Sequence, residues 1–130
     1  MANVLSATAK EEMAQVFLSN DMRLVLLDST YVYDAAHDNL NDVSGGSRVA
    51  VSSSLTGKSA TGGILDADDV PFASLTGDDV TQAWLYKHTG TESTSKLWIY
   101  IDSAIGLTFV PDGQNLLVKW GNGANKIAAL

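Results

Sequence analysis

Apolar and polar residues alternate over most of this chain, and only its first twenty residues follow a helical spacing. The apolar residues of that segment share one helical stripe, at i, i+4, i+7 and i+8: Ala9, Met13, Val16 and Phe17. Thr8 and Glu11 have the spacing of a capping box, so we expect a helix that starts there and ends at 19–21. A helix of about three turns is marginal alone in water. It must therefore dock on its own sheet or on a neighbouring subunit.

The middle of the chain predicts short strands at 22–27, 48–53, 64–65 and 70–72. The strand at 48–53 alternates, with Val49 and Val51 on the face opposite Arg48, Ala50 and Ser52. The strand at 70–72 contains a proline, which cannot donate to a ladder, so we expect it at a sheet edge or at the start of a strand. Residues 29–43 look irregular, with one helical turn at 38–43 capped by Asp38.

The strongest β pattern lies at 80–89 and 96–103, which a short polar connection with a glycine joins as a hairpin. On the first strand, one face carries Val80, Gln82, Trp84, Tyr86 and His88. On the second strand, Leu97, Ile99 and Ile101 face opposite to Trp98, Tyr100 and Asp102. Further strands are expected at 107–110, 116–120 and 126–130, separated by turns at 111–113 and 121–123.

These elements predict a mainly β protein: an antiparallel β-sandwich or small barrel of about seven to eight strands with a short N-terminal α-helix. A second helix of useful length is not indicated, which argues against a parallel βαβ sheet. The 130 residues suit one β-rich domain over 1–130, with 1–21 as an N-terminal helical arm.

Charge and composition narrow the function classes. Eight Lys and Arg stand against 15 Asp and Glu, which gives a net charge of −7. So few cations make nucleic acid or an anionic membrane an unsuitable partner. There is no cysteine, hence no disulfide, zinc–thiolate site or thiol nucleophile. The sequence begins without the pattern of a signal peptide and has no apolar run of membrane-spanning length, so we expect synthesis in the cytoplasm.

Catalytic and metal-binding patterns are weak. His37 and His88 are the two histidines, and no serine stands in a G-x-S-x-G turn, so we expect no enzyme and no cofactor. The acidic residues that could gather around Ca²⁺ are Asp66, Asp68, Asp69, Asp78 and Asp79. Their spacing is not that of an EF-hand, and aspartate is common in turns, so solvated turns are the simpler interpretation.

Large apolar side chains stand on both faces of the expected hairpin. A two-layer sandwich needs only one apolar face per sheet, so the second face must also be covered, either within the protein by the helix or the core, or by a neighbouring subunit. Tryptophan and tyrosine are also enriched in binding hot spots and in carbohydrate platforms. The candidate interface residues are therefore Met13, Val16, Phe17, Trp84, Tyr86, Trp98, Tyr100 and Trp120.

The order of several short motifs resembles a family of small virion proteins of tailed bacteriophages. The motifs are DADDV at 66–70, the run from Ala83 to Asp102 that contains YKHTG, and WGNGANKI at 120–127. Earlier segments fit as well, with LVLLD at 24–28 and HDNLNDV at 37–43. The resemblance covers nearly the whole chain. It departs from the family at 96–100, where Trp98 replaces a smaller apolar residue.

The resemblance implies a structural component of a phage particle, located in the virion, with no catalytic residue to carry over. Size, a β-rich body and a helix that is not stable alone lead us to expect a capsid decoration (cement) protein that bridges capsid subunits. Its partners would be the major capsid protein or other virion proteins, and it would form a homo-oligomer such as a closed trimer. A neck, tail or fibre-base protein and a host-surface carbohydrate-binding module are the alternatives.

Overall fold

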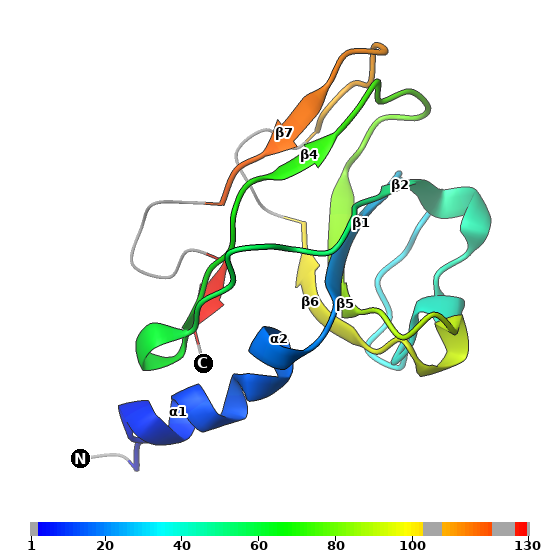
Figure 1. Ribbon diagram of the computed structural model, residues 1–130. Helices are drawn as coiled ribbons and strands as arrows, with labels where there is room; N and C mark the ends of the chain where they lie inside the picture. Colours follow the sequence, from blue (N-terminus) through cyan, green and yellow to red (C-terminus); the bar gives the residue numbers. More distant parts are fainter. Residues whose placement is uncertain (1–2, 103–107, 121–126, 130) are drawn as a thin grey trace.

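A computed structural model describes residues 3–102, 108–120 and 127–129 (Figure 1). The prediction of a mainly β, antiparallel fold with a short N-terminal helix is confirmed. The helical part consists of α1 (Ala7–Met13) and α2 (Gln15–Ser19). The described residues form eight strands: β1 (Met22–Leu27), β2 (Arg48–Val51), β3 (Ile64–Leu65), β4 (Val70–Phe72), β5 (Gln82–Lys87), β6 (Leu97–Ile101), β7 (Leu116–Val118) and β8 (Ala128–Ala129). Short 3₁₀ turns lie at Leu40–Asp42, Gly45–Ser47, Thr61–Gly63 and Glu92–Thr94.

Four strands form the central sheet, in the order β2-β1-β5-β6, and every neighbouring pair is antiparallel. The expected hairpin is confirmed as the pair β5–β6. In the described part of the chain, β2 and β6 each pair on one side only, so this sheet is open rather than closed into a barrel. Two antiparallel ribbons, β4–β7 and β3–β8, lie beside it (Figure 1).

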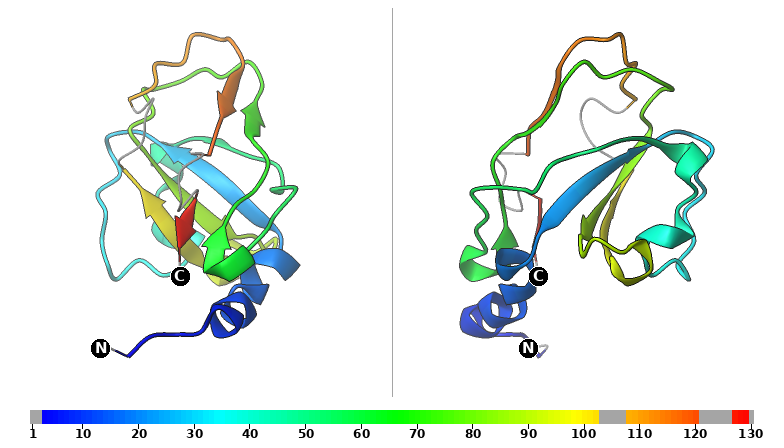
Figure 2. Two further views of the ribbon diagram at one scale, coloured as in Figure 1. Left: turned by 90° about the vertical axis from the view of Figure 1, so that its left-hand side faces the viewer. Right: turned by 45° about the vertical axis from the view of Figure 1, so that its right-hand side comes forward.

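The central sheet is buried on both faces. On one face, Leu24, Leu26 and Leu85 pack with residues of the ribbons and with Phe17 of α2, and we call this group the main core. The other face carries a second group, which we call the second core. Its sheet residues are Val25, Leu27, Trp84 and Tyr86, with the partly buried Leu97 and Tyr100. The 28–47 segment covers them with Tyr31, Leu40 and Val43. The second face thus forms part of the protein's own core, as one alternative had it, and a long loop of the same chain covers it rather than the helix (Figure 2).

Both edge strands of the sheet contain a β-bulge, which the alternating pattern did not predict. In β6 the pairing steps from Leu85↔Ile99 to Tyr86↔Leu97, so Trp98 is the extra residue. Trp98 therefore packs with Ile99 on the main core, while Leu97 joins Tyr100 on the second core. The predicted faces of Leu97 and Trp98 were wrong, because an extra residue reverses the side-chain alternation beyond it.

The same change occurs in β2. Its pairing steps from Leu26↔Ala50 to Leu27↔Arg48, so Val49 is the extra residue, and Val49 and Ala50 both pack on the main core. The strand ends earlier than predicted, and its exposed end is Val51. Ser52 beyond it is buried, and its Oγ accepts a hydrogen bond of 2.9 Å from the amide of Leu24. The expected half-buried alternation over 48–53 is therefore wrong.

The two ribbons place the predicted short strands within this chain. The edge position of the proline strand is confirmed, because β4 pairs with β7 alone among the described strands. The last strand, β8, pairs with β3, with Leu65 opposite Ala128. Phe109 forms a single bridge with Val80 in place of the strand expected at 107–110, whose first residue lies outside the described part. The turn expected at 121–123 and residues 126 and 130 of the last strand also lie outside it.

Two predicted caps are corrected. The helix starts at Ala7, because the hydroxyl oxygen of Ser6 accepts a 3.1 Å hydrogen bond from the amide of Ala9; Thr8 is not the cap. Glu11, the expected partner in that cap, instead accepts a bond of 3.2 Å from the amide of Gly62. The turn at 38–43 is a 3₁₀ turn over Leu40–Asp42 that is capped by Asn39 rather than by Asp38.

The predicted apolar stripe of the helix is divided by a break at Ala14 between α1 and α2. Ala14 and Phe17 are fully buried in the main core, whereas α1 contains no buried residue. In every view α1 lies at one end of the molecule, beyond the strands (Figures 1 and 2). The N-terminal segment is thus anchored through α2 and leaves α1 at the surface.

Gly63 allows α1 to approach the 3₁₀ turn at Thr61–Gly63. A Cβ built on Gly63 would lie 2.7 Å from the Cβ of Lys10, and its φ is +83°. Gly62 has a similar φ of +64°, but a Cβ there would meet nothing within 4 Å. We expect Gly63→Ala to lower the free energy of unfolding by about 1–3 kcal/mol more than Gly62→Ala does, because both add strain and only the first adds a clash.

Urea denaturation of the two alanine variants would measure this difference, and amide hydrogen exchange would locate it. We expect faster exchange in α1 for Gly63→Ala alone. Equal stabilities would mean that the contact between α1 and the 3₁₀ turn does not restrain the helix.

Candidate interaction surfaces

The eight predicted interface residues separate into three groups. Met13 and Val16 are exposed, at 55% and 39%. Trp98, Tyr100 and Trp120 are half-buried. The buried members are Phe17 in the main core and Trp84 and Tyr86 in the second core. These last three side chains pack inside their own chain, Phe17 against the main core and Trp84 and Tyr86 beneath the 28–47 segment, and they leave little surface for a partner.

Two exposed residues near the N-terminus extend the group that Met13 and Val16 begin. Val4 is 80% exposed and Leu5 is 52% exposed, and both precede α1. We call Val4, Leu5, Met13 and Val16 the N-terminal apolar surface. Sequence reasoning missed the first two, although their apolar pair before the helix cap was a visible signal. Val4 and Leu5 precede the first turn of α1, Met13 ends it and Val16 lies in α2, so exposed apolar side chains stand at both ends of α1. Exposed apolar residues that gather on a soluble protein mark interaction sites.

Several aromatic side chains lie together on the face of the central sheet that carries the second core, at the point where this core reaches the surface. The rings of Tyr33 and Tyr100 are stacked, with centroids 4.8 Å apart and planes at 19°. Trp84 lies 5.2 Å from Tyr100 and 6.0 Å from Tyr33. Tyr31 is the fourth member, 6.4 Å from Tyr100. We call these four residues the aromatic cluster.

Hydrogen bonds hold the buried part of the aromatic cluster in place. The indole Nε1 of Trp84 donates to the hydroxyl of Tyr31 at 3.0 Å, and that hydroxyl also bonds Nδ1 of His37 at 2.9 Å. The buried Gln82 amide donates to the carbonyls of Asp28 and Tyr31, and its oxygen accepts from the hydroxyl of Tyr100. The ring of His37 thus has a tyrosine hydroxyl as its partner.

Burial raises the pKa values of Tyr31 and Tyr100, and neighbouring carboxylates add to the effect. Asp34 and Asp42 act on Tyr31, and Asp102 acts on Tyr100. The phenols therefore stay neutral near pH 7, as donors and acceptors in fixed hydrogen bonds. Nucleophilic or general-base chemistry is not what this arrangement supplies.

The other predicted residues have local structural partners. The indole of Trp120 donates to the carbonyl of Asp68 at 3.2 Å. The carboxylate of Asp68 accepts from the hydroxyl of Thr56 at 3.1 Å, in a turn. His88 was expected on the strand at 80–89 and instead follows the end of β5 at Lys87, where its backbone amide donates to the carbonyl of Asp21. Within the described residues there is no group of three His, Asp or Glu side chains placed to hold a metal ion.

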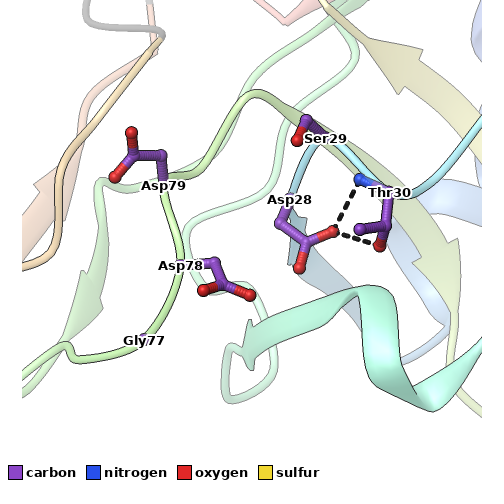
Figure 3. Close-up of a pocket in the computed structure, with 6 residues that line it drawn as sticks. All are labelled: Asp28, Ser29, Thr30, Gly77, Asp78 and Asp79. Carbon is purple, nitrogen blue, oxygen red and sulfur yellow. Dashed lines mark hydrogen bonds between the residues drawn. The ribbon is translucent and has the colours of Figure 1, made fainter.

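A polar hollow lies where the 28–47 segment leaves the sheet. It is lined by Asp28, Ser29, Thr30, Gly77, Asp78 and Asp79 (Figure 3). Asp28 is buried, and its carboxylate accepts hydrogen bonds from the hydroxyl and the amide of Thr30. Asp79 points away from Asp28. The hydrogen bonds from Thr30 hold the pKa of the Asp28 carboxyl below its ordinary value.

Asp28→Asn tests the contribution of this charge to stability. A lowered pKa in the folded state stabilises the protein above the ordinary value of 3.8, and this stabilisation is lost as the pH falls through the folded-state pKa. We expect the variant to be less stable than the parent at pH 7, and the difference to shrink below pH 3.8. Urea denaturation from pH 7 to pH 2.5 would measure it, with the exposed Asp79→Asn as the matched control. A difference that does not depend on pH would contradict the assignment.

Comparisons with known proteins add no relative: no protein-family model matches the chain, and a search of curated proteins finds no match. The described residues contain no helix that is both long and apolar enough to cross a membrane.

Proposed function

We propose that this chain is a non-enzymatic structural protein of a tailed-bacteriophage particle, and that it decorates the capsid by bridging neighbouring capsid subunits. The order of its motifs resembles that in small virion proteins, and this resemblance supports the assignment to a phage particle. The N-terminal apolar surface is the single observation that carries the bridging role. Both features fit a protein whose task is contact rather than chemistry.

The N-terminal apolar surface belongs to a segment whose first helix packs on the 3₁₀ turn at Thr61–Gly63 but contains no buried residue. α1 has no buried residue, and its end and the residues before it present exposed valine, leucine and methionine side chains. Packing on a partner would remove these side chains from water and stabilise a helix that is too short to be stable alone. Phe17 of α2 anchors the N-terminal segment in the main core. A partner that binds this segment would therefore also be joined to the β-sheet part of the protein.

Capsid stabilisation then follows from mass action over many copies. A ligand that binds only the assembled shell shifts the equilibrium toward that shell. Each specific contact needs an area of the order of 1,000 Å² to be stable. The net charge of −7 keeps the free protein soluble and repels packaged DNA, which suits the outer surface. Closed three-fold clusters are one arrangement compatible with such bridging.

Stoichiometry is the direct test of the proposal. Quantitative mass spectrometry of purified particles of the encoding phage would give the molar ratio of this chain to the major capsid protein. A ratio near one, or between one-third and two-thirds, is the expected result. A ratio of a few per cent would instead indicate a neck, tail or fibre-base protein and overturn the decoration role. Absence of the chain from particles would overturn the virion proposal as well.

A variant with two changes on the N-terminal apolar surface tests the bridging mechanism. We expect Met13→Ser with Val16→Ser to weaken rebinding to stripped particles by at least tenfold, since two apolar contacts are lost. The matched control is Val51→Ser with Val110→Ser, two exposed valines outside that surface. Sedimentation of particles with labelled protein would measure the binding. Equal loss in both variants would contradict the assignment of the contact to the N-terminus.

A further inference from the structure

Tyr33 presents an aromatic ring at the surface in a fixed orientation. Half of the residue is exposed, and one side of its ring is stacked on Tyr100 at 4.8 Å and 19°. The ring belongs to the 28–47 segment, whereas Tyr100 belongs to β6. The two elements thus meet at an aromatic ring that is half exposed, and this exposed half is the part that a ligand could contact.

The support beneath the ring is rigid. Tyr100 bonds Gln82 through its hydroxyl and packs on Trp84, and Trp84 bonds the hydroxyl of Tyr31. Each of these polar groups is satisfied inside the chain. A ring on such a support loses little conformational entropy when a ligand stacks on it.

Carboxylates surround the aromatic cluster. Asp34 follows Tyr33 directly, Asp102 stands two positions beyond Tyr100, and both are exposed. Asp42, also exposed, is close enough to act electrostatically on Tyr31. Among the described residues, the two ion pairs are Arg23–Asp21 and Arg48–Glu92, so these three carboxylates are in neither. The surface around the aromatic cluster is therefore negatively charged.

We propose that Tyr33 binds an arginine side chain of a basic protein segment, with the guanidinium stacked on the ring and paired with Asp34 or Asp102. The face of a tyrosine ring attracts a cation within about 6 Å of its centroid. The planar guanidinium also stacks well and bonds a carboxylate through two N–H groups. The proposal concerns a surface other than the N-terminal apolar surface and does not depend on the phage role.

Charge distinguishes this ligand from a carbohydrate, the other common partner of an exposed tyrosine. A sugar has no charge for the carboxylates to attract and binds through hydrogen bonds to its hydroxyl groups, and the buried Gln82 amide already uses its bonds inside the chain. The acidic residues around the ring favour a cation instead. Arginine is favoured over lysine because the ammonium group is more strongly hydrated and cannot stack.

Titration of the ¹⁵N-labelled protein with the peptide acetyl-Gly-Arg-Gly-Arg-Gly-amide would test the proposal by chemical-shift changes. We expect saturable shifts at Tyr33 and Asp34, with an affinity that falls as salt is added. Tyr33→Ala should weaken binding about five- to tenfold, whereas Tyr33→Phe should retain it. The indole N–H signal of Trp84 reports whether the aromatic cluster stays intact in each variant.

A second pair of variants keeps the test decisive if Tyr33→Ala disturbs the cluster. Asp34→Asn and Asp102→Asn retain the side-chain shape, and we expect each to weaken peptide binding and reduce its salt dependence. Equal affinity in all variants would overturn the proposal. So would equal binding of the lysine counterpart of the peptide, or saturable binding of methyl glucoside at Tyr33 in place of the peptide.

Discussion

Phe17→Ala is expected to lower the free energy of unfolding by about 3–5 kcal/mol, the range for truncating a fully buried phenylalanine. Phe17 has no exposed surface, and it packs in the main core with residues of β1 and of both ribbons. The ammonium group of Lys58 lies over its ring, 5.8 Å from the centroid. A domain of this size is stable by about 5–15 kcal/mol in total, so the variant would lie near the limit of folding.

Urea denaturation followed by tryptophan fluorescence and by circular dichroism would measure this loss. The matched control is Val16→Ala, one position earlier in α2, where the side chain is partly exposed and we expect a change below about 1 kcal/mol. Coincident transitions from both signals would show that α2 unfolds with the sheet. If Phe17→Ala melted the helix alone, residues 1–21 would behave as the separate arm that the sequence suggested.

Gln82→Leu is the second change with a large expected effect, about 2–4 kcal/mol of lost stability, although leucine has nearly the same size. The buried amide of Gln82 donates to the carbonyls of Asp28 and Tyr31 at 2.8 and 2.7 Å. Its oxygen accepts from Tyr100. Leucine would remove these bonds from the carbonyl of Tyr31 and the hydroxyl of Tyr100, and would leave the carbonyl of Asp28 with only the 3.4 Å bond from the amide of Tyr31. The desolvation of these groups would then be poorly compensated.

The consequences of Gln82→Leu should appear first in the 28–47 segment. We expect faster amide hydrogen exchange at Tyr31 and Leu40 and a shifted indole signal for Trp84, because the segment loses its central attachment to β5. Gln114→Leu, at an exposed position, is the control and should change stability by less than about 0.5 kcal/mol. Unchanged exchange would mean that apolar packing alone holds the segment to the sheet.

Local patterns predicted much of this fold. The bounds of β1 at Met22–Leu27 agree with the predicted strand, because its run of apolar residues is bounded by polar ones. The β5–β6 pairing and the edge position of β4 also agree. Each of these predictions rests on residues that are close in sequence, where side-chain period and turn chemistry act directly.

The candidate surfaces were harder to predict. Met13 and Val16 are exposed as an interface requires, whereas Trp84 and Tyr86, from the strongest aromatic pattern, are buried. Tyr33 was not singled out, since it stands in a segment without periodicity. A tyrosine in such a segment can be covered or exposed, and its environment depends on where the segment folds back.

By itself, the sequence determined that the chain is mainly β, that its helix needs an anchor and that both faces of the hairpin must be covered, because hydrophobic period and composition constrain burial locally. Only the tertiary structure decided which segment covers each face, and that Val49 and Trp98 are bulged. Alternation along a strand does not encode register between strands that are distant in sequence. The register between these strands and the segment that covers each face depend on long-range packing, as around Phe17, and on buried hydrogen bonds, as around Gln82.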